Sequence, residues 1–177
     1  LNSHQGDFYA LDAENGKILW SKNLLKDFGG RRPDWGFSGS PLCVADMVIF
    51  ETGSEKGSLV ALDAKSGEPR WRAGDHEAAY SSPMMRTYGK GEILVFNGYG
   101  LVSHNLSDGR ELKRYQHKTR FGINAAQPID LGSSVLISSA YGKGSALVDL
   151  ERTRPRALWE SSSFSCQMAS LVRLEGY

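Results

Sequence analysis

The sequence predicts an all-β protein, a β-propeller built from four-stranded antiparallel blades. The first observation behind this prediction is a segment that occurs twice almost unchanged, as ALDAENGKILW at residues 10–20 and as ALDAKSGEPRW at residues 61–71. The second is a series of prolines in step with that segment, and the third is a set of short β-type runs between the two signals. Self-similarity at a period of about 40–50 residues, with four strands per repeat, is typical of propeller blades.

The repeated segment keeps four residue types at constant spacing. The two complete copies lie 51 residues apart and consist of Ala10, Asp12, Gly16 and Trp20, and of Ala61, Asp63, Gly67 and Trp71. A third copy retains Gly109 but has Lys113 at the tryptophan position. A fourth retains Trp159 but has Pro155 at the glycine position. The repeat therefore continues through the chain in a weaker form.

Three prolines, each followed by a short apolar run, keep the same register as the repeated segment. They precede the glycine position of their unit by 26, 26 and 27 residues, and they are Pro41, Pro83 and Pro128. A related run at 168–174 has Leu171 in place of the proline and predicts the start of a further unit. Small residues before each proline fit an inner strand, because neighbouring blades crowd together at a propeller axis, and a proline at a strand start costs no ladder hydrogen bond.

Two β-type runs, rich in β-branched and aromatic residues, separate each proline from its glycine position. They cover 47–52 and 58–63 in the first unit, 93–98 and 101–106 in the second, and 133–139 and 146–150 in the third. Asn-Gly, Ser-Gly and Asp-Gly turn dipeptides introduce fourth strands. No window shows sustained helical periodicity with caps, so each unit of 42 to 51 residues is expected to hold four strands.

These units form a single propeller segment of about four blades over the whole chain. The expected boundaries are a partial blade at 1–24, blades at about 35–74, 77–116 and 122–161, and a partial blade at 165–177.

The glycine and the tryptophan of the motif have a packing explanation. Glycine takes a turn position with positive φ and leaves one backbone face bare. A tryptophan four residues later can lay its large ring over a neighbouring glycine and alanine. We therefore interpret Trp20, Trp71 and Trp159 as contacts between blades and not as ligand sites.

The complete copies resemble the tryptophan-docking motif of the pyrroloquinoline-quinone (PQQ) type propellers. That superfamily includes quinoprotein alcohol dehydrogenases and BamB-like lipoproteins of the outer-membrane assembly machine, and the pieces WGFSGSP, AYSSP and FGINAAQP resemble the BamB-like branch more closely. The resemblance implies a ring of about eight blades, so the chain is expected to be half of a longer propeller. An alternative is that its last strand pairs with its first strands, which would give a four-bladed ring or a swapped homodimer through open blade edges. The resemblance alone implies a periplasmic or cell-envelope location.

Charge and composition argue against several kinds of partner. With 21 basic and 20 acidic residues the net charge is +1, and no basic stripe supports nucleic-acid binding. No apolar run approaches the roughly 20 residues that a membrane-spanning helix needs. We interpret Cys43 and Cys166 as small buried residues and not as a disulfide, because they occupy different positions within their units.

Patterns for catalysis or metal binding are missing from the sequence. It has neither the adjacent cysteine pair that the resemblance leads us to expect in a quinoprotein dehydrogenase nor a D-x-D-x-D-G calcium loop. Its four histidines show no metal-ligand spacing, and no G-x-S-x-G elbow or phosphate-binding glycine loop occurs. We predict no catalytic residue, no metal ligand and no cofactor, and we keep PQQ with calcium only for the dehydrogenase alternative.

A ligand site, if the chain has one, is expected where the loops entering the inner strands converge on one rim. These loops contribute Asp34, Trp35, Tyr80, Arg120, Asn124 and Gln167. An arginine, amides and aromatic rings can bind an anionic or peptidic ligand. The competing interpretation is that the same side chains form hydrogen bonds to neighbouring blades.

Three functional hypotheses follow. The first is a non-enzymatic, BamB-like scaffold that binds protein partners through the loop rim or through an exposed strand edge. The second is a piece of a PQQ-dependent dehydrogenase. The third is a propeller that binds carbohydrate or polyanion through Arg120 and Trp35.

Overall fold

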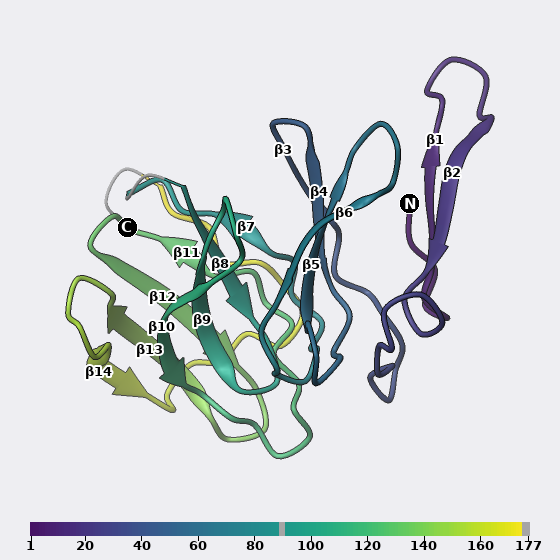
Figure 1. Ribbon diagram of the computed structural model, residues 1–177. Helices are drawn as coiled ribbons and strands as arrows, with labels where there is room; N and C mark the ends of the chain where they lie inside the picture. Colours follow the sequence, from purple (N-terminus) through teal and green to yellow (C-terminus); the bar gives the residue numbers. More distant parts are fainter. Residues whose placement is uncertain (89–90, 175–177) are drawn as a thin grey trace.

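The computed structural model describes residues 1–88 and 91–174, whose strands form one two-stranded and three four-stranded antiparallel sheets (Figure 1). The two-stranded sheet consists of β1 (Asp7–Leu11) and β2 (Ile18–Asn23). The first complete sheet contains β3 (Leu42–Val44), β4 (Met47–Glu51), β5 (Leu59–Asp63) and β6 (Pro69–Ala73). The second contains β7 (Met84–Met85), β8 (Glu92–Phe96), β9 (Gly100–Asn105) and β10 (Glu111–Gln116). The third contains β11 (Ile129–Asp130), β12 (Ser134–Ser139), β13 (Gly144–Asp149) and β14 (Arg156–Ser161).

Each complete sheet is an up-and-down meander in which consecutive strands pair. The pairing register repeats from sheet to sheet: Met47 pairs with Asp63, Glu92 with Asn105, and Ser134 with Asp149. The described residues contain no helix, and the predicted all-β propeller fold is confirmed.

The sheets follow one another in an open arc. In Figure 1 the β1–β2 hairpin (purple) lies at one end of the molecule and β14 (yellow-green) lies toward the other. Residues 162–174, which follow β14, form no strand and do not pair with the hairpin. The structure therefore does not show the four-bladed ring that was one of the expected alternatives. The partial blade expected at 165–177 stays a prediction, and residues 175–177 lie outside the described part of the chain.

Hydrophobic cores lie between successive sheets, because neighbouring residues of a strand face opposite sides. Phe50 on β4 belongs to the core that also contains Phe8 of the β1–β2 hairpin. The adjacent Ile49 belongs to the next core, with Ile93 and Val95 of β8. A third core joins the second and third complete sheets and contains Leu94, Phe96, Leu101, Val135, Ile137, Ala146, Val148 and Leu150.

Both complete copies of the motif join their sheet to the following sheet. Trp20 Nε1 donates a hydrogen bond to the carbonyl oxygen of Ala64 at 3.0 Å. A Cβ atom built on Gly67 would lie 2.7 Å from the Trp20 ring, so only glycine fits beneath it. The arrangement recurs one sheet further on, where Trp71 Nε1 donates to the carbonyl oxygen of Leu106 at 3.0 Å and the ring covers Gly109, on which a Cβ atom would clash with the ring.

The two imperfect copies lose complementary halves of this contact. Lys113 stands at the tryptophan position of the third copy, and Pro155 stands at the glycine position of the fourth. Since Trp20 and Trp71 dock on the glycine of the next unit, these two positions belong to the same junction. The Lys113 ammonium group donates to the carbonyl oxygen of Leu150, which is equivalent to the carbonyls that Trp20 and Trp71 use.

The two cysteines correct a prediction. Cys43 is exposed and Cys166 is half-buried, and both are free thiols. Cys43 is the middle residue of β3, so it points away from the side to which Leu42 and Val44 turn. The expected burial of Cys43 was therefore wrong, because the three-residue strand has only one packed face.

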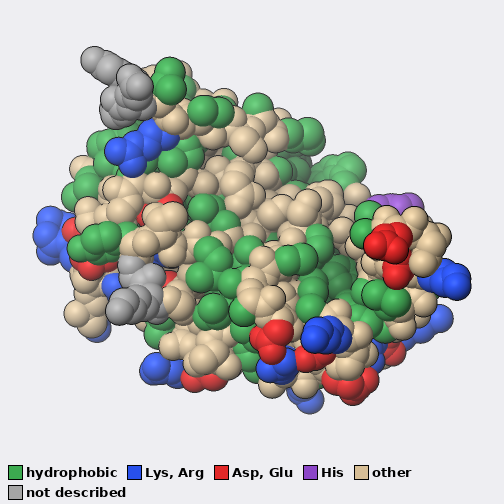
Figure 2. All heavy atoms as spheres, turned by 90° about the horizontal axis from the view of Figure 1, so that it is seen from above, with side chains coloured by type: hydrophobic (Ala, Val, Ile, Leu, Met, Phe, Trp, Pro, Cys, Tyr) green, Lys and Arg blue, Asp and Glu red, His purple; other side chains and the backbone are tan. Residues whose placement is uncertain are grey.

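Charged side chains lie mainly along the border of the face seen in Figure 2, and hydrophobic side chains reach the surface across its middle. Basic and acidic groups mix along this border, without a stripe of one sign. In residues 1–88 and 91–174 no helix is long and apolar enough to span a membrane.

Candidate functional site

A hollow of about 450 Å³ opens among the loops that enter the inner strands. We call it the rim hollow and define it by its lining residues, which are Trp35, Ser38, Tyr80, Ile123, Ala125, Tyr141, Gln167 and Met168. The residues come from the β2–β3, β6–β7 and β10–β11 loops, from the β12–β13 turn, and from the segment after β14. The site is thus assembled from all three complete sheets and their connections.

Contacts between the loops set the shape of the rim hollow. The Trp35 backbone N–H donates to the Tyr80 hydroxyl at 3.4 Å, and the two rings meet edge to face with centroids 6.1 Å apart. On the other side, Gln167 Nε2 donates to the Tyr141 hydroxyl at 2.8 Å. Tyr141 adopts a φ of 59°, a left-handed conformation that is rare for a residue with a side chain.

The rim hollow offers apolar surface with a few polar groups. Trp35 is 62% exposed and Met168 is 76% exposed, although both are large apolar side chains. Burial raises the pKa of Tyr80, so its phenol keeps its proton at neutral pH. Hydroxyl and amide groups at the edge of an aromatic hollow suit a neutral or peptidic ligand, since no lining residue carries a positive charge.

A second, more polar hollow of about 330 Å³ shares Tyr80 with the rim hollow. It is lined by Arg31, Arg32, Pro33, Asp34, Glu77, Ala78, Tyr80, Phe121 and Gly122. Both arginines are already engaged: Arg31 forms an ion pair with Glu55 at 2.7 Å, and Arg32 donates to Gln5 at 2.8 Å.

The structure brings together some of the residues that sequence analysis proposed for the rim. Trp35, Tyr80 and Gln167 line the rim hollow, and Asp34 lines the adjacent polar hollow. Arg120 lines neither of them, and its guanidinium lies over the Phe121 ring at 5.1 Å. The carbohydrate or polyanion hypothesis needed Arg120 and Trp35 in one site, and the structure does not place them in the same hollow.

Asn124 does not line either hollow and instead forms hydrogen bonds inside the protein. It is fully buried, and its amide donates to the carbonyl oxygens of Asn97 at 2.7 Å and His117 at 3.1 Å. Its Oδ1 accepts a hydrogen bond from Ser139 at 2.6 Å. Asn124 therefore joins the second sheet to the third, which is the competing interpretation for this residue.

Sequence reasoning missed Tyr141 and Met168. Tyr141 lies in the piece YGKG, which reads as a hairpin turn, and its left-handed conformation is not marked by glycine or asparagine at that position. Met168 lies at the start of an apolar run that predicts a strand but has none in the structure. The convergence of loops on one rim could be inferred from the repeat pattern. The contribution of the segment after β14 to the rim hollow could not.

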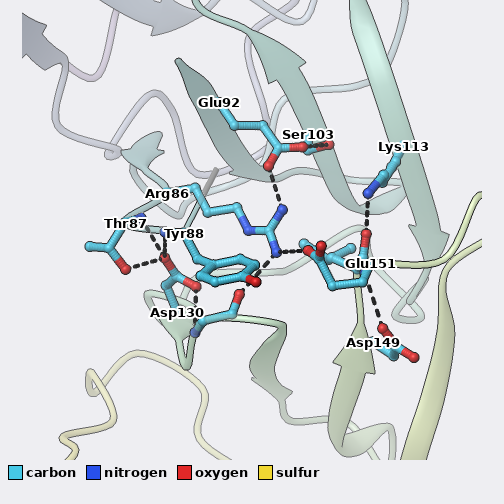
Figure 3. A network of polar contacts seen from close by, with 11 residues as sticks. Arg86, Thr87, Tyr88, Glu92, Ser103, Lys113, Asp130, Asp149 and Glu151 are labelled. Atoms are coloured by element: carbon cyan, nitrogen blue, oxygen red, sulfur yellow. Dashed lines mark hydrogen bonds and ion pairs between the residues drawn. The ribbon is translucent and has the colours of Figure 1, made fainter. Parts of the chain in front are cut away.

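The most strongly buried charge cluster lies away from the rim hollow, between the second and third sheets (Figure 3). Arg86 donates to Glu92 at 2.5 Å, to Glu151 at 2.7 Å and to the carbonyl oxygen of Gly132 at 2.9 Å. Its side chain is only 2% exposed, and its partners come from both sheets. Since both terminal nitrogens of the guanidinium have partners within the chain, we interpret this cluster as a clamp between sheets.

A second acid, the half-buried Glu51, lies at the end of β4. Its Oε2 accepts a long hydrogen bond of 3.4 Å from the Ala79 N–H, while its Oε1 lies out of solvent without a partner among the described residues. Burial raises the pKa of Glu51 to about 8. Glu51 and the buried Ser81 line a small cavity of about 20 Å³ next to the β1–β2 hairpin.

The described residues do not fit PQQ held by calcium. No three His, Cys, Asp or Glu side chains gather into a metal-holding group within 1–88 and 91–174. The rim hollow supplies no cationic side chain for the carboxylates of such a cofactor. We derive no chemical step through this group.

Successive four-stranded meanders joined by tryptophan–glycine docking define a propeller of the tryptophan-docked class, with a candidate site on its loop rim. The chain belongs to the family described as outer membrane protein assembly factor BamB, whose model matches residues 1–173. The predicted resemblance to this family is confirmed.

The similar proteins include BamB proteins and quinone alcohol dehydrogenases. The outer membrane protein assembly factor BamB of Alteromonas naphthalenivorans is 28% identical over 153 residues, which cover 78% of this chain and 35% of that protein. The dehydrogenase subunit of a quinone alcohol dehydrogenase from Komagataeibacter europaeus is 28% identical over 103 residues, which cover 50% of this chain and 14% of that protein. The crystal structure of BamB from Moraxella catarrhalis superposes with a TM-score of 0.55 and 22% identity over 89% of this chain and 44% of that chain. This chain spans less than half the length of each of these proteins.

Proposed function

We propose that this chain belongs to a non-enzymatic scaffold of the cell envelope that binds a protein partner in the rim hollow. The observation that carries the proposal is the convergence of exposed apolar and aromatic side chains on one hollow, among them Trp35, Tyr141 and Met168. Rigid aromatic rings with polar tips are the side chains on which binding energy concentrates at protein interfaces. Membership of a family described by an assembly factor of the outer membrane supports a partner and a location of this kind.

The partner segment that fits best is an extended peptide with aromatic or aliphatic side chains. The rim hollow has the volume of a small-ligand pocket, so it can take one or two side chains at a time. Ser38 and Gln167 lie at the same hollow and can form hydrogen bonds with a peptide backbone.

NMR titration of the isotope-labelled chain tests this proposal. The probes are a short peptide in which Phe and Leu alternate with Ser, and a matched peptide in which every Phe and Leu is replaced by Ser. We expect the first peptide to shift the Trp35 indole and the Gln167 side-chain amide signals, and the second to leave them unchanged. Trp35→Ala should weaken binding by at least about tenfold.

Leu19→Ala is the matched control, since Leu19 is an equally exposed apolar residue on β2 that does not line the rim hollow. The proposal fails if the apolar peptide shifts neither signal, or if Trp35→Ala and Leu19→Ala affect its affinity equally.

The dehydrogenase alternative rests on the similarity to quinone alcohol dehydrogenases. A ligand that binds only the folded protein at 100 times its dissociation constant adds about 2.7 kcal/mol to stability. Under the scaffold proposal, PQQ with calcium therefore leaves the melting temperature unchanged. A rise of several degrees, with quinone absorbance retained after desalting, would favour the dehydrogenase alternative.

A further inference from the structure

Two segments that meet between the second and third sheets carry positive charge and no negative charge. Residues 117–129 and 131–148 contain neither aspartate nor glutamate. Their cationic residues are Lys118, Arg120 and Lys143. In the part of the chain that the structure describes, none of these three side chains forms an ion pair with a carboxylate. Their charge is therefore available to a ligand.

Neighbouring titratable groups leave this charge in place. Burial, and secondly the charge of Lys143, lower the pKa of His117 to about 4, so the His117 ring is neutral at pH 7. Glu160, whose charge also acts on His117, accepts a hydrogen bond from the Tyr115 hydroxyl on β10. The two segments therefore keep a net positive charge at neutral pH.

An aromatic pair holds Arg120 in position. The Arg120 guanidinium lies over the Phe121 ring at 5.1 Å, and the Phe121 and Tyr141 rings meet edge to face with centroids 5.4 Å apart. Both rings are about half exposed, at 49% and 46%. A guanidinium stacked on a ring has less freedom to move, but its N–H groups can still form two parallel hydrogen bonds with a carboxylate.

We call Lys118, Arg120, Phe121, Tyr141 and Lys143 the basic surface. It borders the rim hollow, because Tyr141 also lines that hollow.

The polar hollow, which Phe121 lines, has a different charge balance. It contains the carboxylates of Asp34 and Glu77 besides its two engaged arginines. An acidic ligand is therefore favoured at the basic surface and not in the polar hollow.

We propose that the basic surface selects partner peptides in which acidic residues flank the apolar anchor. This inference rests on the proposed function, since the anchor occupies the rim hollow. An extended peptide rises about 3.3 Å per residue, so we expect the acidic residue about three positions from the anchor. Arg120 pairs with its carboxylate, and Lys118 and Lys143 add attraction that depends less on direction. Charges of this kind determine which partner binds more than they determine how tightly the anchor is held.

Fluorescence anisotropy with labelled peptides tests the inference. Each peptide carries the alternating Phe, Leu and Ser sequence, has blocked ends, and is extended at one end or the other by three Asp, three Ser or three Lys. At about 0.01 M salt we expect at least one Asp version to bind at least about threefold more tightly than its Ser version, and the Lys versions to bind most weakly. At about 1 M salt this difference should disappear, because salt screens exposed charges.

Arg120→Gln should reduce the ratio of the Asp and Ser affinities by at least about twofold and leave the affinity of the Ser version unchanged. Arg110→Gln is the matched control, because it removes the same charge from the turn at the other end of β10. Equal affinities of the Asp and Ser versions, or equal effects of the two substitutions, would overturn this inference and leave the proposed function standing. Failure of every version to bind would overturn both.

Discussion

At the residue scale, Glu51 couples stability to pH. Its pKa is about 8 in the folded protein because of burial, and its ordinary value is 4.5. Between these values the unfolded chain has lost the proton and the folded chain keeps it, so stability falls as the pH rises. One pKa unit corresponds to 1.36 kcal/mol, which makes the loss between pH 4.5 and pH 8 on the order of 4–5 kcal/mol.

Glu51→Gln removes this titration and retains the shape of the side chain. We expect the free energy of unfolding of the unmodified protein to fall by several kcal/mol more between pH 5 and pH 8 than that of the variant, as measured by urea denaturation. Parallel pH profiles for the two proteins would show that Glu51 ionises freely in the folded state.

Loss of the Arg86 side chain should lower the free energy of unfolding more than loss of its exposed partner Glu151. Replacement by alanine leaves the Glu92 carboxylate, which is 9% exposed, without its ion-pair partner. Removing one member of a buried pair costs about 3–5 kcal/mol. Glu151 is 47% exposed, so Glu151→Ala should cost no more than about 1 kcal/mol. Chemical denaturation of both variants measures the difference, and equal losses would contradict the role of Arg86 as a clamp.

At the element scale, Lys113 replaces tryptophan in the motif contact between the second and third sheets. Lys113→Met retains most of the apolar stem but removes the donor to the Leu150 carbonyl oxygen. Hydrogen bonds to charged groups contribute about 1.5–3 kcal/mol to stability, so we expect the free energy of unfolding to fall by an amount in that range. Lys65→Met at an exposed turn position is the control and should change stability by less than about 0.5 kcal/mol. The two variants can be compared by thermal denaturation, where equal melting temperatures would show that the Lys113 contact contributes nothing.

Sequence reasoning predicts the strands well and the rim less well. The glycine, proline and tryptophan spacings locate strands because each residue type has one backbone or packing role there, as at Gly67 and Trp20. The rim residues lack such roles. Asn124 looks the same in a sequence whether it binds a ligand or joins two sheets, and only its three internal hydrogen bonds distinguish these cases. Tyr141 joins the rim hollow through a turn conformation that its residue type does not predict.

At the scale of the whole molecule, repeated docking makes one molecule out of separate sheets. Trp20 and Trp71 each dock on the glycine of the next unit, whereas at the third junction Lys113 faces the unit with Pro155. One contact therefore uses the tryptophan of one unit and the glycine of the next. This explains why the third copy lacks the tryptophan and the fourth copy lacks the glycine. The rim hollow depends on this succession, since its lining comes from loops of successive sheets.

The most direct test of this account is a double-mutant cycle at Trp71 and Gly109, with the global free energy of unfolding as the measured quantity. Gly109→Ala alone introduces a Cβ that would clash with the Trp71 ring, and it adds backbone strain at a φ of 72°. In the Trp71→Ala background the clash with the ring is gone, whereas the backbone strain of about 1–2 kcal/mol and a close approach of 2.8 Å to the Ala73 Cβ remain. The account predicts that the double variant is more stable than the sum of the single losses by at least about 1 kcal/mol. Additive losses would contradict the docking of each tryptophan on the glycine of the following sheet.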